Sequence, residues 1–281
     1  MYLIEIIEIP FMQRALIGSI LLAVILGFFG VFMVPRKLSF MADGIAHASL
    51  FGIAVGLLVG GMPLLWAIGL ALILGTLLAK ISDNESIPMD AVIGICLVGG
   101  MSGALITMTF IPGYKPELFS YLFGSILSIE WNDIYILSAL TAVTLILFKV
   151  QWRTLVITTI HNDLSKVLGL KANAAKYFLF IGTSIALIGG VKLLGVILIS
   201  ALLVIPYSSA SLIGKSLKSC VILTQIIAVA GTITGIFISY IFDFPTGPAI
   251  GLLLVAIYLL AFTYSKIRSQ PIWKSNHTPL Y

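Results

Sequence analysis

The sequence predicts an all-α integral membrane protein, and three observations lead to this fold class. Hydrophobic residues make up 60% of the 281 residues, charged residues make up 10%, and the mean hydropathy is +1.15. A water-soluble domain of this composition would expose large apolar patches. The apolar residues also form long stretches with short polar breaks, and the basic residues gather in alternate breaks. We therefore expect a single transmembrane domain over residues 1–281.

Nine apolar stretches are long enough to cross a bilayer, whose hydrocarbon core of about 30 Å requires about 20 residues of helix. The break at Gly189, Gly190 and Lys192 is the least distinct, so eight helices with one kinked or re-entrant segment are the alternative. In order, the predicted helices are Pro10 to Val34, Met41 to Gly60, Pro63 to Lys80, Met89 to Ile111, Asp133 to Val150, Ala174 to Gly190, Leu193 to Gly214, Ser219 to Phe242 and Pro248 to Tyr264.

The basic residues predict the orientation of these helices, because Lys and Arg gather in cytoplasmic loops. With the N-terminus outside, all but three of the 16 Lys and Arg fall on the cytoplasmic side; the exceptions are Arg14, Lys115 and Lys192. We therefore expect an external N-terminus and a short cytoplasmic tail over residues 265–281. The basic residues are scattered singly, which argues against nucleic-acid binding.

Two segments do not resemble simple spans. Residues 112–131 are apolar but interrupted by Pro and Gly, and we expect an external helix or a re-entrant element there. Residues 158–173 are expected to be a cytoplasmic loop with a short helix, with Asn162 or Asp163 as its N-cap and Gly169 at its end. Leu164, Val167 and Leu168 would share one apolar face, by their i, i+3, i+4 spacing. This face could pack onto the chain's own helix ends or dock onto a partner protein.

Asp43 and His47 are the carboxylate and the imidazole that fall within a predicted span. A charge at the centre of a membrane helix costs from about 2.5 kcal/mol upward, so such residues are candidates for function. Their spacing of four residues places both side chains on one face of a helix. Small residues that would let another helix or an ion approach surround them: Ala42, Gly44, Ala46 and Ala48.

Three roles are compatible with this pair. A carboxylate and an imidazole are suitable ligands for Zn²⁺ or Mn²⁺, and two ligands suit a path that an ion must also leave. The pair could instead stabilise helix packing through bonds to each other or to the backbone, or it could relay protons. No permanently bound cofactor is expected. The sequence has no GxxxxGK[ST] motif for ATP and no nucleophile with an adjacent base, so an enzyme is not expected.

Five blocks in the same order resemble the permease subunits of the ABC importers that carry zinc, manganese or iron. The first contains the D-x-x-x-H-A pattern of that family's second helix. The blocks are KLSFMADGIAHASLFGIAVGLL (37–58), SYLFGSILSI (120–129), HNDLSKVLGLKA (161–172), VKLLGVILISALLVIP (191–206) and DFPTGPAIGLLL (243–254).

This resemblance implies roles for both groups of residues named above. It assigns the metal pathway to Asp43 and His47. The segment that docks onto the ATPase would contain Asp163, Leu164, Val167, Leu168 and Gly169.

The resemblance also implies an assembly and a location. We expect a permease homodimer with two cytoplasmic ABC ATPase subunits and an extracytoplasmic metal-binding protein, in a prokaryotic plasma (inner) membrane. The cargo would be a divalent metal ion, which the QWR block (151–153) and the AHASL run (46–50) suggest is zinc. A proton-coupled secondary transporter is the alternative of another class. An intramembrane metalloenzyme would need more ligands than one Asp and one His.

Overall fold

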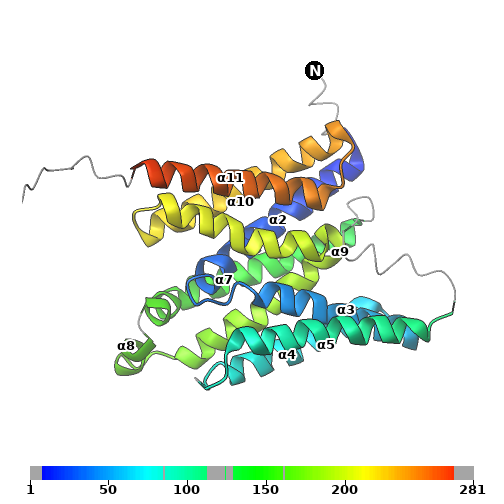
Figure 1. Cartoon of the computed structure of the whole chain (residues 1–281), viewed down its shortest axis with the longest axis horizontal. Helices are drawn as coiled ribbons and strands as arrows, with labels where there is room; N and C mark the ends of the chain where they lie inside the picture. Colours follow the sequence, from blue (N-terminus) through cyan, green and yellow to red (C-terminus); the bar gives the residue numbers. More distant parts are fainter. Residues whose placement is uncertain (1–7, 85, 113–123, 125–128, 161, 269–281) are drawn as a thin grey trace, which may run out of the picture.

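The computed structural model describes residues 8–84, 86–112, 124, 129–160 and 162–268, apart from the side chains of residues 162, 163 and 166. The long helices run back and forth along one axis, and the short α8 lies at one end of the bundle (Figure 1). The described helices are α2 (Pro10–Met33), α3 (Met41–Val59), α4 (Pro63–Ile81), α5 (Met89–Thr109), α7 (Trp131–Ile160), α8 (Asn162–Val167), α9 (Ala172–Ile213), α10 (Leu217–Phe242) and α11 (Thr246–Arg268).

The predicted all-α membrane class is confirmed. Eight of these helices, all except α8, are long and apolar enough to cross a membrane, and the described residues contain no strand. The predicted external element at 112–131 lies mostly outside the described residues. The count of nine spans and the orientation of the termini stay predictions.

Helix α9 reverses direction at Gly195. Its 42 residues would extend about 63 Å as a straight helix, about twice the hydrocarbon thickness. The backbone of Gly195 is non-helical, with φ 76° and ψ 162°. On one side of it, Gly182 packs against the ring of Phe29 of α2; on the other side, the carbonyl oxygen of Leu203 packs against Gly30, the next residue of α2. Both halves of α9 therefore pass the same level of α2, and α9 is a helical hairpin.

The position of this reversal corrects the predicted boundary. The break was expected between Gly190 and Leu193, whereas the helix continues through these residues and breaks at Gly195. The φ and ψ of Gly195 belong to a region that only glycine enters readily, so the glycine at this position can make the turn. Gly189 and Gly190 have helical backbone, which does not require glycine.

Helix α7 is longer than predicted. It continues to Ile160, ten residues beyond the expected end at Val150. Lys149 and Arg153 lie on either side of the predicted end, but a charged residue does not stop a helix. Helix α7 therefore reaches past the predicted edge and leads almost directly into α8.

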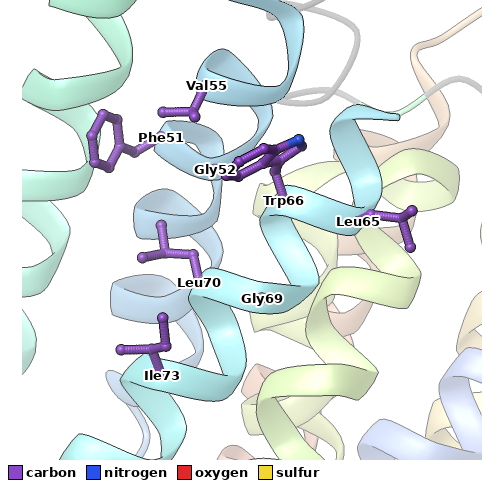
Figure 2. A pocket seen from close by; sticks show the side chains of 8 residues that line it. All are labelled: Phe51, Gly52, Val55, Leu65, Trp66, Gly69, Leu70 and Ile73. Atoms are coloured by element: carbon purple, nitrogen blue, oxygen red, sulfur yellow. The ribbon is translucent and has the colours of Figure 1, made fainter. Parts of the chain in front are cut away.

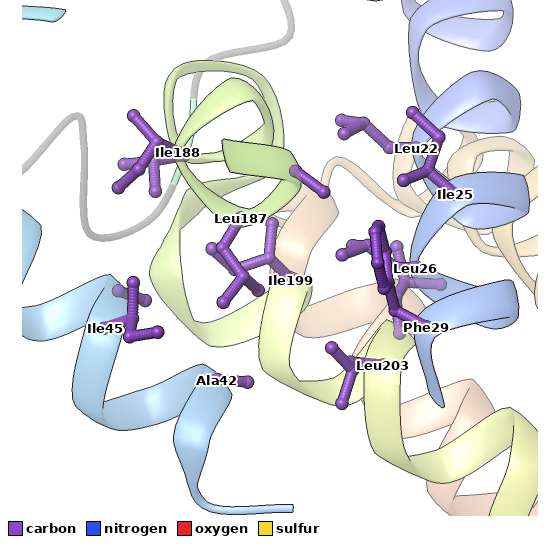
Figure 3. Packing of buried hydrophobic residues seen from close by; sticks show 14 of the residues in the cluster. Leu22, Ile25, Leu26, Phe29, Ala42, Ile45, Leu187, Ile188, Ile199 and Leu203 are labelled. Atoms are coloured by element: carbon purple, nitrogen blue, oxygen red, sulfur yellow. The ribbon is translucent and has the colours of Figure 1, made fainter. Parts of the chain in front are cut away.

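Small residues bring α3 close to two neighbouring helices, α4 and α5. Gly100 of α5 lies against the backbone of Ala48, and Gly52 of α3 lies against Ala67 of α4. Close approach of this kind is the main source of helix association in lipid, where burial of apolar surface gains little. Helix α3 also contributes Ala42 and Ile45 to the core, beside residues of α2 and α9 (Figure 3). Helix α3 is consequently much more buried than α5.

Two adjacent glycines of α5 provide a test of this packing. A Cβ atom at Gly100 would lie 2.2 Å from the Cα atom of Ala48, whereas a Cβ atom at Gly99 would meet nothing within 4 Å. We expect Gly100→Ala to lower the free energy of unfolding by about 1–3 kcal/mol, the usual cost of overpacking. Gly99→Ala is the matched control and should not destabilise the protein. Thermal unfolding in detergent measures both, and equal shifts in Tm would contradict the α3–α5 contact.

Candidate functional site

Asp43 and His47 lie on one face near the start of α3. Asp43 is in the first turn, where the positive end of the helix dipole favours a carboxylate. Both side chains are half-buried, whereas Ala42, Gly44 and Ala46 between and beside them are buried. The structure therefore brings the predicted pair together on a face that the rest of the chain leaves partly open.

A hydrogen bond fixes the ring of His47. Its Nδ1 atom lies 2.9 Å from the backbone carbonyl oxygen of Asp43, four residues earlier. A carbonyl oxygen only accepts, so Nδ1 must carry the proton and donate it. The lone pair of the neutral ring then belongs to Nε2. Histidines that bind metals commonly have this arrangement, because the bond at one nitrogen orients the other toward the ion.

The carboxylate of Asp43 makes no hydrogen bond or ion pair with any residue that the structure describes, His47 included. A role in helix packing was considered for this pair. Of the bonds that this role would require, the described residues show only the one from His47 to the backbone carbonyl of Asp43. One carboxylate and one ring nitrogen remain available on the same helix face. A cation could bind between them.

Among the described residues of one chain, Asp43 and His47 are the two ligands at this position. The described residues contain no group of three or more His, Cys, Asp and Glu side chains that could hold a metal. Structural zinc sites have four protein ligands, so the described residues of a single chain do not form such a closed site here. The pair is instead suited to weak, transient binding with water or a second chain completing the coordination.

An apolar cavity of about 440 Å³ lies farther along α3, between it and α4 (Figure 2). Phe51 and Val55 line it and continue the row of His47 at four-residue spacing. Trp66 and Ile73 of α4 lie on its other side. The lining residues include no ionisable group, so the cavity adds no ligand to the pair.

The short helix α8 leaves its apolar side chains uncovered. Leu164, Val167 and Leu168 are 47%, 83% and 46% exposed, and Gly169 ends the segment with φ 64°. Of the two roles considered for this face, packing onto the chain's own helix ends is therefore not seen at these three side chains. The side chain of Asp163, also expected at a partner contact, lies outside the described residues.

Among the polar contacts that were not predicted from the sequence, two join α7 to other parts of the chain. Lys192 of α9 binds the carboxylate of Asp133 of α7, with its Nζ atom 2.8 and 3.0 Å from the two oxygens. Opposite charges at two neighbouring helix ends on the same predicted side could have suggested this pair. At the other end of the bundle, Arg36 donates to the hydroxyls of Thr158 and Thr159. No sequence pattern indicates that contact.

Most of the chain is similar to known permeases. Residues 8–265 match the ABC 3 transport family. The manganese import system permease protein ScaB of Streptococcus gordonii is 30% identical over 255 residues, which cover 91% of each chain. The high-affinity zinc uptake system membrane protein ZnuB of Haemophilus influenzae is 26% identical, with 88% of this chain and 95% of that protein covered.

A solved structure agrees with the fold. It is that of PsaBC from Streptococcus pneumoniae in complex with Fab, with a TM-score of 0.82, 28% identity, and 95% of this chain and 98% of that chain covered. The resemblance seen in the five sequence blocks is thereby confirmed, as is the expectation of a transport permease that is not itself an enzyme. The chain belongs to the ABC 3 transport family and is a multi-pass permease of the metal-ion ABC importers in a prokaryotic plasma membrane.

Proposed function

We propose that this chain forms the path through which a divalent transition-metal ion enters the cytoplasm, driven by ATP hydrolysis in a separate ATPase subunit. One observation carries the proposal: the Asp43 carboxylate and the Nε2 atom of His47 lie on one face of α3 and bind no residue that the structure describes. An intramembrane carboxylate is costly unless it meets a cation or water. A partly dehydrated metal ion passing through would meet both groups.

A second copy of the chain would complete the site. Each chain supplies one oxygen ligand and one nitrogen ligand, and two copies facing each other would supply four, the number typical of zinc. The half-buried position of both residues is compatible with a path shared between two protomers. A site split between protomers would also release its ion readily, because a small separation of the copies breaks half of the ligands.

We propose zinc as the preferred ion, with manganese as the second candidate. Imidazole favours zinc and carboxylate favours manganese, so the pair of ligands alone does not decide between them. The relatives are likewise divided, with ScaB named for manganese and ZnuB for zinc. The preference for zinc rests on the QWR and AHASL sequence blocks.

The exposed apolar face of α8 would receive the ATPase. The helix projects at the end of the bundle that carries the predicted cytoplasmic loops (Figure 1). Closure of two ATPase subunits around ATP would move α8, and the bundle would open alternately to the two sides. An extracytoplasmic metal-binding protein would deliver the ion at the opposite end. A proton-coupled transporter has no need of this uncovered face.

Substitution of His47 tests the metal path. His47→Asn retains an N–H group that can bind the Asp43 carbonyl but has no atom equivalent to Nε2. We expect both His47→Asn and His47→Ala to reduce metal uptake at least about tenfold, as loss of a ligand does, while membrane insertion stays normal. Uptake of zinc and of manganese into vesicles containing the full importer is the measurement, with His277→Ala in the tail as control. Normal uptake by His47→Asn would rule out Nε2 as a ligand.

Substitution of Val167 tests the docking face. Val167→Asp places a charge on the most exposed residue of this face, and burial of that charge against a partner costs several kcal/mol. We expect the ATPase to stop co-purifying with this variant, whereas Val167→Ile keeps the face apolar and should retain it. Retention of the ATPase by both variants would show that α8 does not bind it.

A further inference from the structure

Arg36 joins two parts of the chain that are far apart in sequence. It lies in the loop between α2 and α3, and its guanidinium reaches the last turn of α7. Its Nη2 atom donates to the hydroxyl oxygens of Thr158 and Thr159 at 2.8 and 3.0 Å, and its Nε atom donates to that of Thr159 at 3.2 Å. The two threonine hydroxyls donate in turn to the backbone carbonyls of Thr154 and Leu155, so their lone pairs are free to face the guanidinium.

The environment of Arg36 is unusual for a cation. Burial lowers its pKa to about 10, so the guanidinium stays charged at neutral pH although much of its water is removed. In the part of the chain that the structure describes, the ion pairs are formed by Lys176 and Lys192, and no carboxylate pairs with Arg36. Neutral hydroxyls compensate a desolvated charge less well than a carboxylate does. A contact of this kind is a costly way to gain stability alone.

The two ends of the contact belong to functionally distinct elements. Arg36 is followed by Lys37, which has the left-handed φ of 60°, and Asp43 lies in the first turn of α3 shortly after. The strained backbone at Lys37 indicates a loop whose conformation is held by its contacts. Thr158 and Thr159 precede α8 by a few residues. The contact therefore joins the end of α7, next to the element that would dock the ATPase, to the loop that leads into the helix with the proposed metal ligands.

Packing between helices offers one connection among the described residues, through α9, which contacts both α8 and α3. Helix α3 packs mainly on α4, α5 and α9, whereas α7 packs on α2, α8 and α9. The loop that holds Arg36 provides a second connection, from the end of α7 to the start of α3. A polar cavity of about 290 Å³ beside Arg36, Asp83 and Lys176 gives the guanidinium room to shift as these elements move.

We infer that Arg36 is a positioning residue for transport, because its clamp on Thr158 and Thr159 couples the movement of α8 to α3 and so to Asp43 and His47. This inference rests on the proposed function, since it requires an ATPase that acts on α8. The clamp is defined here as the hydrogen bonds from Arg36 to these two threonines. Without the clamp, ATP hydrolysis would continue, but Asp43 and His47 would no longer move in response to it.

The test uses the full importer in vesicles, with metal uptake and ATP hydrolysis measured together. Arg36→Gln removes the charge, and the double variant Thr158→Val with Thr159→Val removes the acceptors at nearly constant shape. For both we expect ATP hydrolysis within about twofold of the parent and metal transported per ATP reduced about tenfold, a normal size for coupling between sites. Arg36→Lys keeps the charge without the planar fork and should be intermediate. Arg153→Gln is the control, because Arg153 lies on α7, the helix that carries Thr158 and Thr159, and its side chain is exposed.

An unchanged ratio of metal to ATP in Arg36→Gln and in the double threonine variant would overturn the inference. Combining Arg36→Gln with the threonine changes separates a clamp from a general loss of stability. For a clamp the combined variant is no worse than either alone, and additive losses would contradict it.

A second readout does not depend on transport. Hydrogen exchange at the first turn of α3 should change on ATP binding in the parent complex and not in Arg36→Gln. The same response in both complexes would also overturn the clamp. If the parent complex itself transports no metal, the proposed function fails, and the exchange measurement still decides the role of Arg36.

Discussion

The requirement that every backbone hydrogen bond within lipid be satisfied by the chain itself controls this structure. Helices meet that requirement, and non-helical backbone at membrane depth is tolerated only where protein covers it. Gly195 is such a point, and Gly124 lies directly against it, so close that a Cβ atom there would be 2.5 Å from the Gly195 nitrogen. The reversal of α9 thus depends on cover from a segment far away in sequence. Three residues before Gly195, Lys192 forms an ion pair with Asp133, which ties the reversal of α9 to the start of α7.

Close helix packing has a consequence for the polar residues. Because glycine and alanine at Gly100 and Ala48 bring α3 and α5 into backbone contact, α3 is held firmly on one side. Asp43 and His47 stay half-buried, although Phe51 of the same row packs against Gly103 of α5. Rigid placement and partial openness suit an ion path, since the ligands must keep their geometry and yet release the ion. The helix that carries the proposed ligands is consequently held as a unit by its contact with α5.

Some of these features follow from the sequence and others do not. Span positions were predictable because lipid demands long apolar stretches, and the common face of Asp43 and His47 was predictable from helix geometry alone. The turn was predicted a few residues before its actual position at Gly195. The sequence contains three candidate glycines there, and they are distinguished by backbone dihedral angles, which the sequence does not reveal. The apolar pattern of Leu164 and Val167 was visible, but its exposure depends on what the rest of the chain covers. The contact from Arg36 to Thr158 joins residues 122 positions apart and has no local signature.

Two groups of charged residues differ in a way that bears on mechanism. Lys192 with Asp133 and Lys176 with Asp83 are satisfied pairs that tie helix ends together. Asp43 and Arg36 have no such partner among the described residues: a carboxylate without a cation at the start of α3, and a guanidinium without a carboxylate in the loop that precedes it. Unpaired charges cost stability, and a chain under selection only for stability would pair them. A carboxylate left open can meet a passing cation, and a guanidinium held by weak neutral acceptors can exchange them as the helices move. Both deficits are therefore located where transport requires a group that can change partners.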